Sequence, residues 1–183
     1  MPSPLVGLRL PIKTRRLRLE LPRASQVDEY VALLGDFEVS RWLLHVPYPY
    51  RKRDARRLIA RARSARRGGS ALILAVVDKR TGRQVGDIRL THLDWTHRGG
   101  ELGYCIGRPY WGNGYATEAA SALVRVAFRQ LRLHRLEACV FRGNRRSARL
   151  LTKLGFRREG TRREAFHLRG AWVDDIVFGL VRS

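Results

Sequence analysis

The sequence predicts an α/β fold, with one mixed, mostly antiparallel sheet of about seven strands and four helices. Three observations predict it: strand-like and helix-like segments alternate, short turns join neighbouring strands, and no linker, repeat or low-complexity block divides the 183 residues. A chain of this length suits one domain, since domains usually span about 100–200 residues. We therefore expect a single domain over residues 1–183.

The first third of the chain predicts one strand and two helices. Residues 14–21 alternate polar and apolar side chains, which is typical of a half-buried strand. Ser25 is the expected N-cap of a helix that ends at a turn formed by Gly35 and Asp36. A basic helix over residues 53–67 follows and ends at a pair of glycines.

Three strands come next. Residues 70–78 form an apolar run that predicts a buried strand, and a Lys-Arg-Thr-Gly turn joins it to a strand over residues 84–95. A second turn at residues 98–100 leads to a strand over residues 101–107.

The rest of the chain alternates helices and strands. A long helix is expected because apolar residues recur at helical spacing. These residues are Ala116, Ala119, Ala120, Leu123, Val124, Ala127, Phe128 and Leu131. We then expect strands over residues 135–141, 156–166 and 172–182, with a short helix over residues 145–154.

The charge of the chain is strongly positive. The 37 Lys and Arg residues outnumber 16 Asp and Glu residues, which gives a formal net charge of +21, and nearly all of the basic residues are Arg. A net charge of this size indicates which partners the protein attracts and how soluble it is, and it does not indicate the fold. Two interpretations stay open: Arg-rich solvated faces, or attraction to a polyanion such as a phosphate-rich cofactor, an acidic protein or ribosomal RNA.

The sequence predicts neither a metal site nor a membrane segment. Cys105 and Cys139 form no Cys-x-x-Cys pair, so both are expected to be small core residues. No apolar run approaches the ~18–20 residues of a membrane span, and prolines and an arginine interrupt the apolar N-terminal residues, so no signal peptide is predicted. We expect a cytoplasmic protein with no membrane partner.

Residues 101–120 are the most informative segment, because an apolar strand there leads through a glycine-rich turn directly into a helix. Gly112 and Gly114 carry no side chain, so the backbone N–H groups around Asn113, Tyr115 and Ala116 can close on an anion. The positive end of the helix dipole favours an anion at the same place. The segment therefore predicts a phosphate site.

Residues 111–116, Trp-Gly-Asn-Gly-Tyr-Ala, resemble the pyrophosphate loop of the GNAT N-acetyltransferases, with Trp111 where most of that superfamily has Gln or Arg. The longer run Glu-Leu-Gly-Tyr, then Pro-x-Trp-Gly-x-Gly-Tyr-Ala-Thr-Glu-Ala, is similar to the RimJ/RimL-type branch, which acts on ribosomal proteins. A second segment, residues 144–156, resembles the family pattern Asn-x-x-Ser-x-x-Leu-x-x-x-Gly-Phe. The resemblance extends from about residue 14 to residue 183.

The resemblance implies a GNAT fold in which the fourth and fifth strands splay apart and acetyl-CoA fills the gap. It also implies that the second segment lies along the pantetheine arm and the thiol. The residues implied for acetyl-CoA binding are Tyr104, Cys105, Ile106, Trp111, Gly112, Asn113, Gly114, Tyr115, Ala116, Thr117, Asn144, Ser147 and Arg149.

Two residues are the candidates for catalysis. The resemblance implies that Glu101 acts as base or holds the amine, directly or through water; alternatively it is a solvated carboxylate facing Arg98 or Arg108. Ser147 is implied to protonate the leaving thiolate; alternatively it satisfies the first turn of a helix whose N-cap is Asn144. Direct attack by a cysteine is disfavoured, because no His partner is visible in the sequence.

The loop over residues 43–50 resembles the acceptor-lining loop of the same branch. The candidate acceptor contacts are Trp42, His45, Tyr48 and Tyr50. An α-amine has a pKa of ~7.7–8.0 against ~10.4 for lysine, so an N-terminal acceptor needs only weak base assistance near neutral pH.

Three functions remain as alternatives. The first is acetyl transfer from acetyl-CoA to the N-terminal α-amine of a protein such as a ribosomal protein, with an acidic protein or the ribosome as a contact. The second is the same reaction on a small amine: a polyamine, an amino sugar or an amino acid. The third is a non-catalytic, basic nucleic-acid-binding protein. Proteins of the RimJ/RimL-type branch often dimerise, so a homodimer is one expected assembly.

Overall fold

The computed structural model describes residues 3–182, and their core is one eight-stranded sheet. The strands are β1 (Ile12–Lys13), β2 (Leu17–Glu20), β3 (Leu72–Asp78), β4 (Gln84–Asp94), β5 (Gly99–Ile106), β6 (Arg135–Phe141), β7 (Arg157–Leu168) and β8 (Ala171–Val181). Their order in the sheet is β1-β2-β3-β4-β5-β6-β8-β7. Every described pairing is antiparallel except that of β5 with β6.

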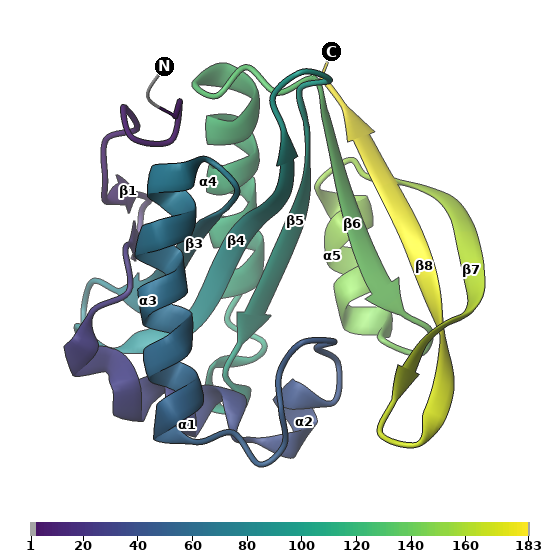
Figure 1. The fold of residues 1–183 in the computed structure, drawn as a ribbon, viewed down its shortest axis with the longest axis horizontal. Coiled ribbons are helices and arrows are strands. Elements are labelled where there is room, and N and C mark those ends of the chain that lie inside the picture. Colours follow the sequence, from purple (N-terminus) through teal and green to yellow (C-terminus); the bar gives the residue numbers. More distant parts are fainter. Residues whose placement is uncertain (1–2, 183) are drawn as a thin grey trace.

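The helices cover both faces of the sheet (Figure 1). They are α1 (Val27–Leu34), α2 (Phe37–Ser40), α3 (Lys52–Gly68), α4 (Tyr115–Arg129) and α5 (Arg145–Lys153). Helices α1 and α3 pack on one face, while α4 packs on the other face against β2, β4 and β5, and α5 contacts β6 and β7. The predicted α/β fold is confirmed, with the short β1 and α2 added to the expected elements.

The sheet is splayed between β5 and β6, as Figure 1 shows. Only three residue pairs join these strands, from Gly99–Arg135 to Glu101–Glu137, and β5 continues to Ile106 beyond them. The splay expected between the fourth and fifth predicted strands is therefore present, at the junction of β5 and β6. It divides the sheet into two arms that diverge from Glu101 onward.

The main core lies between the sheet and α4. Strand β3 is buried along its whole length because it lies inside the sheet with helices on both faces. Helix α4 packs Ala119, Ala120, Leu123 and Ala127 into this core, as its apolar spacing predicts. A second buried cluster, which includes Tyr30, lies under α1 and α3.

Several local predictions were wrong. Ser25 lies inside a 3₁₀ turn over Ala24–Gln26, and the N-cap of α1 is Gln26, without a side-chain hydrogen bond. The turn at Gly35 and Asp36 does end α1, as predicted, and the Asp36 side chain also caps α2 by accepting from the Glu38 N–H at 2.8 Å. Gly99, expected in a turn, already belongs to β5.

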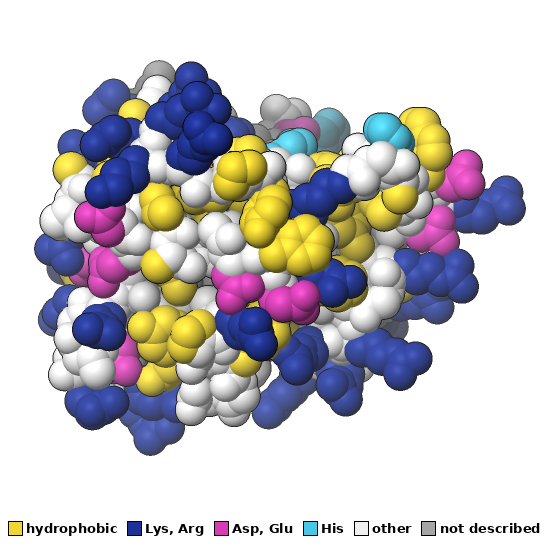
Figure 2. Space-filling view, turned by 90° about the horizontal axis from the view of Figure 1, so that it is seen from below, with side chains coloured by type: hydrophobic (Ala, Val, Ile, Leu, Met, Phe, Trp, Pro, Cys, Tyr) yellow, Lys and Arg dark blue, Asp and Glu magenta, His cyan; other side chains and the backbone are white. Residues whose placement is uncertain are grey.

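No helix among residues 3–182 is both long enough and apolar enough to cross a membrane. The basic side chains are spread over much of the face shown in Figure 2, with few acidic groups among them. This spread agrees with solvated Arg-rich faces for most of the excess positive charge.

Candidate active site

A cavity of about 1950 Å³ runs through the gap between β5 and β6. Both arms of the sheet line it, together with the loop after α2, the start of α4 and α5. Figure 2 shows apolar side chains in the hollow that opens on one face of the molecule. Its volume exceeds the ~300–1,000 Å³ typical of a site for one small ligand, so two ligands can meet in it.

The glycine-rich turn forms one end of this cavity. Gly112 and Gly114 have φ angles of +80° and +74°, in the left-handed region that favours glycine, and Gly114 is the N-cap of α4. The first N–H groups of α4 have no partner within the helix and are directed at the turn. Trp111, Gly112, Gly114, Tyr115, Ala116 and Thr117 line the cavity.

Asn113 lies outside the lining of the cavity among the described residues. Its side-chain amide instead donates to the carbonyl oxygens of Tyr110 and Trp111 at 3.2 Å, which fixes the shape of the turn. Trp111 donates from its indole N–H to the carbonyl oxygen of Ile106 at 2.7 Å. The indole therefore ties the turn to the end of β5, at the position where most GNAT sequences have Gln or Arg.

Basic side chains of α5 face the glycine-rich turn across the cavity. Arg145, Arg146, Arg149 and Lys153 all line it. The Arg146 guanidinium lies over the Trp111 ring at 4.6 Å and so bridges the two arms. Positive side chains together with free helix N–H groups fit a ligand with several phosphates, as acetyl-CoA has.

The free edge of β5 forms the wall of the gap. Tyr104, Cys105 and Ile106 line the cavity beyond the last pair with β6, so their backbone groups on that side are open to a ligand. An extended, amide-containing arm such as pantetheine fits this edge, since it can pair with a strand. Burial raises the pKa of the Cys105 thiol to about 12, which argues against a nucleophilic role.

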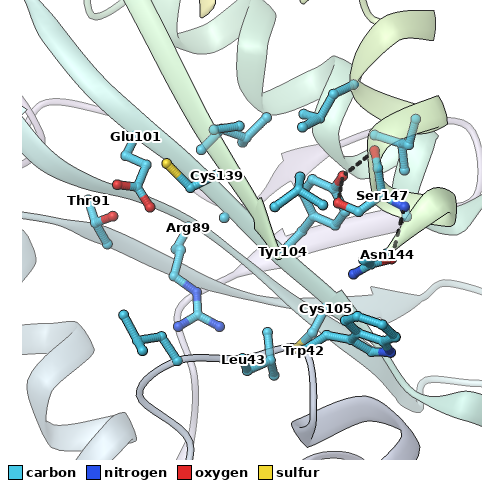
Figure 3. A pocket seen from close by; sticks show the side chains of 18 of the residues that line it. Trp42, Leu43, Arg89, Thr91, Glu101, Tyr104, Cys105, Cys139, Asn144 and Ser147 are labelled. Carbon is cyan, nitrogen blue, oxygen red and sulfur yellow. Dashed lines mark hydrogen bonds between the residues drawn. The ribbon is translucent and has the colours of Figure 1, made fainter. Parts of the chain in front are cut away.

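Ser147 is held at the wall of the gap by two partners (Figure 3). Asn144 caps α5, as predicted, and its side-chain oxygen accepts from the Ser147 N–H at 3.2 Å. The Ser147 Oγ lies 2.7 Å from the Tyr104 hydroxyl. Burial raises the pKa of Tyr104 to about 12, so this hydroxyl stays protonated and can donate to Ser147.

Glu101 occupies the last paired position of β5, at the vertex of the splay. Its carboxylate lies beside Thr91 and Cys139 in the cavity, and Oε2 is 3.3 Å from Nδ1 of His92. The expected partners Arg98 and Arg108 are therefore replaced by His92. His92 belongs to a bulge of β4 and has a φ of +48°.

Glu101 and Ser147 reach the gap from opposite faces of β5. Side chains alternate along a strand, so Glu101 and Cys105 share one face while Leu102 and Tyr104 share the other. Cys105 packs in the cluster under α1 and α3, whereas Tyr104 packs in the core on the side of α4. An acceptor near Glu101 and a donor near Ser147 can thus meet in the gap without crossing the sheet.

The predicted acceptor residues are only partly brought together. Trp42 and His45 line the cavity, and Trp42 approaches Gly143, where a Cβ would lie 3.6 Å from the indole ring. Tyr48 is 53% exposed and packs against Phe37 outside the cavity lining, with ring centroids 5.2 Å apart. Tyr50 is buried in the cluster under α3.

Cys139 departs from the expected core position, since it is only half-buried and lines the cavity. Glu118 stabilises the fold: its carboxylate accepts a hydrogen bond from the Thr14 hydroxyl at 2.6 Å and forms an ion pair with Arg16 at 2.7 Å. It thereby ties the start of α4 to the segment before β2.

Sequence reasoning missed two side chains at the site, the hydroxyl of Tyr104 and the guanidinium of Arg89 on the cavity floor. Tyr104 belongs to the Glu-Leu-Gly-Tyr motif, so a role for its hydroxyl could have been predicted from the sequence. No sequence feature distinguishes Arg89 from the many other arginines of the chain.

Comparisons with known proteins identify the family of this chain. The family model described as the Acetyltransferase (GNAT) domain matches residues 16–157. The uncharacterized N-acetyltransferase p20 of Bacillus licheniformis is 30% identical over 169 residues, which covers 92% of this chain and 94% of that protein. The ribosomal protein uS5-alanine N-acetyltransferase of Escherichia coli is 37% identical over 79 residues, 43% of this chain and 41% of that protein.

Solved structures show the same fold. A structure assigned as a ribosomal-protein-serine acetyltransferase from Vibrio cholerae superposes with a TM-score of 0.80 at 27% identity, over 98% of this chain and 99% of that one. RimJ of Mycobacterium smegmatis, solved with CoA-disulfide, gives a TM-score of 0.81 at 22% identity, over 99% and 86% of the two chains. GNAT acetyltransferases use acetyl-CoA, and the glycine-rich turn, the α5 arginines and the free β5 edge fit it. The chain thus belongs to the GNAT family of N-acetyltransferases.

Proposed function

We propose that this enzyme transfers an acetyl group to the N-terminal α-amine of a protein, with ribosomal proteins as the first acceptors to test. The observation that carries the proposal is the position of Glu101 at the vertex of the splay, facing an open cavity on the side opposite Ser147. Relatives that act on ribosomal proteins support the choice of acceptor. The proposed location is the cytoplasm, where such acceptors are made.

The proposed reaction needs only a few protein groups, for proton transfer and for positioning. The amine nitrogen attacks the carbonyl carbon of the acetyl thioester of acetyl-CoA, a C–N bond forms, and the C–S bond breaks. Glu101 accepts the proton that the amine loses, directly or through water, since an α-amine with a pKa of ~7.7–8.0 is partly neutral near pH 7. Ser147 passes a proton to the leaving thiolate and regains one from the Tyr104 hydroxyl, 2.7 Å away. Solvent then restores the proton of Tyr104 and takes up the proton that Glu101 has accepted.

The test uses matched peptides with a free or a blocked α-amine and mass spectrometry to locate the acetyl group. We expect product only with the free α-amine. Equal transfer to lysine in blocked peptides would refute the proposed acceptor, and turnover restricted to small amines would favour the alternative substrate class.

The roles of the two catalytic candidates are tested separately. Glu101→Gln and Ser147→Ala should each lower kcat by about 10²-fold or more, in the range of general acid–base catalysis. Tyr104→Phe should lower it less, because the serine hydroxyl remains. Ser121→Ala is the matched control, since Ser121 pairs with Arg125 on the exposed side of α4. Full activity of Glu101→Gln would remove that residue from the mechanism.

A further inference from the structure

Arg89 lies in the acceptor half of the cavity and has no assigned role. It belongs to β4, opposite Gly103 of β5, and it shares a sheet face with Glu101. Figure 3 shows its guanidinium between Glu101 and the loop that carries Leu43. Its side chain is 23% exposed, and it lines the cavity floor.

The absence of a side chain at position 103 leaves room for the stem of Arg89. A Cβ at Gly103 would lie 3.1 Å from Cγ and 3.3 Å from Cδ of Arg89, which is tighter than most real Cβ contacts. Another residue at position 103 would therefore displace the arginine stem by a few tenths of an ångström. The stem of Arg89 thus lies over Gly103 of β5, and its side chain lines the cavity.

A buried carboxylate anchors the arginine from behind. Asp87, only 1% exposed, places Oδ1 3.0 Å from Nη2 of Arg89, while its Oδ2 accepts from the Tyr30 hydroxyl at 3.2 Å. This ion pair offsets part of the cost of burying Asp87, although Oδ1 makes no aligned hydrogen bond within residues 3–182. Asp87 and Arg89, two residues apart on β4, thus lie in contact on one face of the sheet.

Asp87 leaves most of the donors of Arg89 unused. A guanidinium has five N–H groups, and Asp87 contacts only Nη2. The Nε is buried without an acceptor among residues 3–182, so a ligand in the cavity meets the arginine through the exposed part of its side chain. The planar fork of Arg suits the two oxygens of a carboxylate, so this side of the cavity suits an anion from the acceptor.

The spacing from Glu101 suits one small acceptor. Thr91 pairs with Glu101 and Arg89 with Gly103, so Arg89 and Glu101 are diagonal neighbours. Such positions are ~7–8 Å apart in a sheet. An amine at Glu101 and a carboxylate at Arg89 can thus belong to the same amino-acid residue or to two adjacent ones.

We propose that Arg89 binds a carboxylate of the acceptor, so that this enzyme prefers amines with an acidic group a few bonds away. The inference rests on the proposed acetyl transfer and narrows its substrate class. The carboxylate has two sources, an acidic side chain near the N-terminus of a protein or the α-carboxylate of a free amino acid. A polyamine, which carries only positive charge, is disfavoured.

The experiment compares acceptors that differ only in charge. One arm uses peptides with Glu or Gln at the first or second position, and the other uses free glutamate and its α-amide. We expect kcat/KM at least about tenfold higher for the acidic member in one arm, as hydrogen bonds to charged groups predict. The arm that shows the preference identifies the source of the carboxylate.

The variant Asp87→Asn/Arg89→Gln removes both charges without leaving a buried carboxylate unpaired and keeps the net charge of the chain. In this variant, the ratio of kcat/KM for the acidic acceptor to kcat/KM for the neutral acceptor should fall to near one. Arg89→Lys should lose most of the preference, because a lysine lacks the fork. Arg83→Gln, in the turn between β3 and β4, is the control for a general loss of positive charge and should keep the ratio.

Binding gives a readout independent of turnover. With CoA present, the N-acetylated acidic product should bind at least about tenfold more tightly than its neutral counterpart, and the double variant should lose the difference. Equal kcat/KM and equal binding for acidic and neutral members would overturn the inference, even if peptides are acetylated. If the enzyme prefers free glutamate over its α-amide and does not acetylate peptides, carboxylate binding by Arg89 is supported and the proposed protein acceptor is refuted.

Discussion

The glycine-rich turn can be tested by placing a charge in it while holding shape and strain constant. Gly112→Glu and Gly112→Gln introduce side chains of equal length at a position with φ of +80° and open space around a Cβ. Both variants share the ~1–2 kcal/mol cost of a left-handed residue. The difference between them isolates the effect of one negative charge beside the phosphates.

The magnitude follows from Coulomb's law. Two unit charges about 6 Å apart interact by roughly 3 kcal/mol at an effective dielectric constant near 20, and salt screening at an open site roughly halves this. Since about 1.4 kcal/mol is tenfold in affinity, Gly112→Glu should bind acetyl-CoA at least about tenfold more weakly than Gly112→Gln.

Isothermal titration calorimetry with acetyl-CoA measures both affinities, and ATP at the same concentration shows how much a +21 chain binds any polyanion. Gly82→Glu is the control, because Gly82 has a φ of +70° and equally open space in the turn between β3 and β4. Equal affinities of the two Gly112 variants, both folded, would refute the assignment of the phosphates to this turn.

Two further predictions concern titratable groups. Burial alone would raise the pKa of Glu118, but hydrogen bonds from Thr14 and Arg16 outweigh burial and lower it. The ionised Glu118 therefore stabilises the fold above its unfolded pKa of ~4.3. This stabilisation is lost as the pH falls through the lower pKa of the folded state. Glu118→Gln should therefore cost about 1 kcal/mol of unfolding free energy near neutral pH and little in acid, measured by urea denaturation at several pH values. Burial raises the pKa of Cys105 and Cys139 to about 12, so alkylation should be slow at about pH 8 and accelerate about tenfold per pH unit toward pH 10 while the fold persists. Fast alkylation near neutral pH would contradict this environment.

The features predictable from the sequence are those encoded over short stretches of chain. The glycine-rich turn, the apolar stripe of α4 and the Asn144 cap each depend on residues within one or two helical turns. The splay was predicted through the family resemblance. Its position at Glu101 depends on the register of β5 with β6, which local patterns do not encode.

The half of the cavity around Glu101, where we propose that the acceptor binds, was less predictable. Arg89, Asp87 and Gly103 lie together only because β4 and β5 pair in one register, and the Arg-rich composition gave no sign that Arg89 lines the cavity beside Glu101. Tyr48 and Tyr50 have similar sequence surroundings, yet one is 53% exposed and the other 6%. The irregular loop between α2 and α3 decides their positions, and tertiary packing rather than local preference sets that loop.

Only three residue pairs join β5 to β6, so past Glu101 the two arms of the sheet are separated by a gap, here called the seam. Beyond these pairs, links across the seam include Arg146 over Trp111, the Tyr104 hydroxyl 2.7 Å from Ser147 Oγ, and a hydrogen bond from Arg169 to the carbonyl oxygen of Ser40 at 3.0 Å. Because only three backbone pairs join β5 to β6, we expect the two arms to separate there at a lower free energy than global unfolding. A ligand lying along the seam replaces the missing backbone ladder. Hydrogen exchange should therefore slow most on binding at the amides of residues 102–106, so that substrate completes the fold as well as reacting in it.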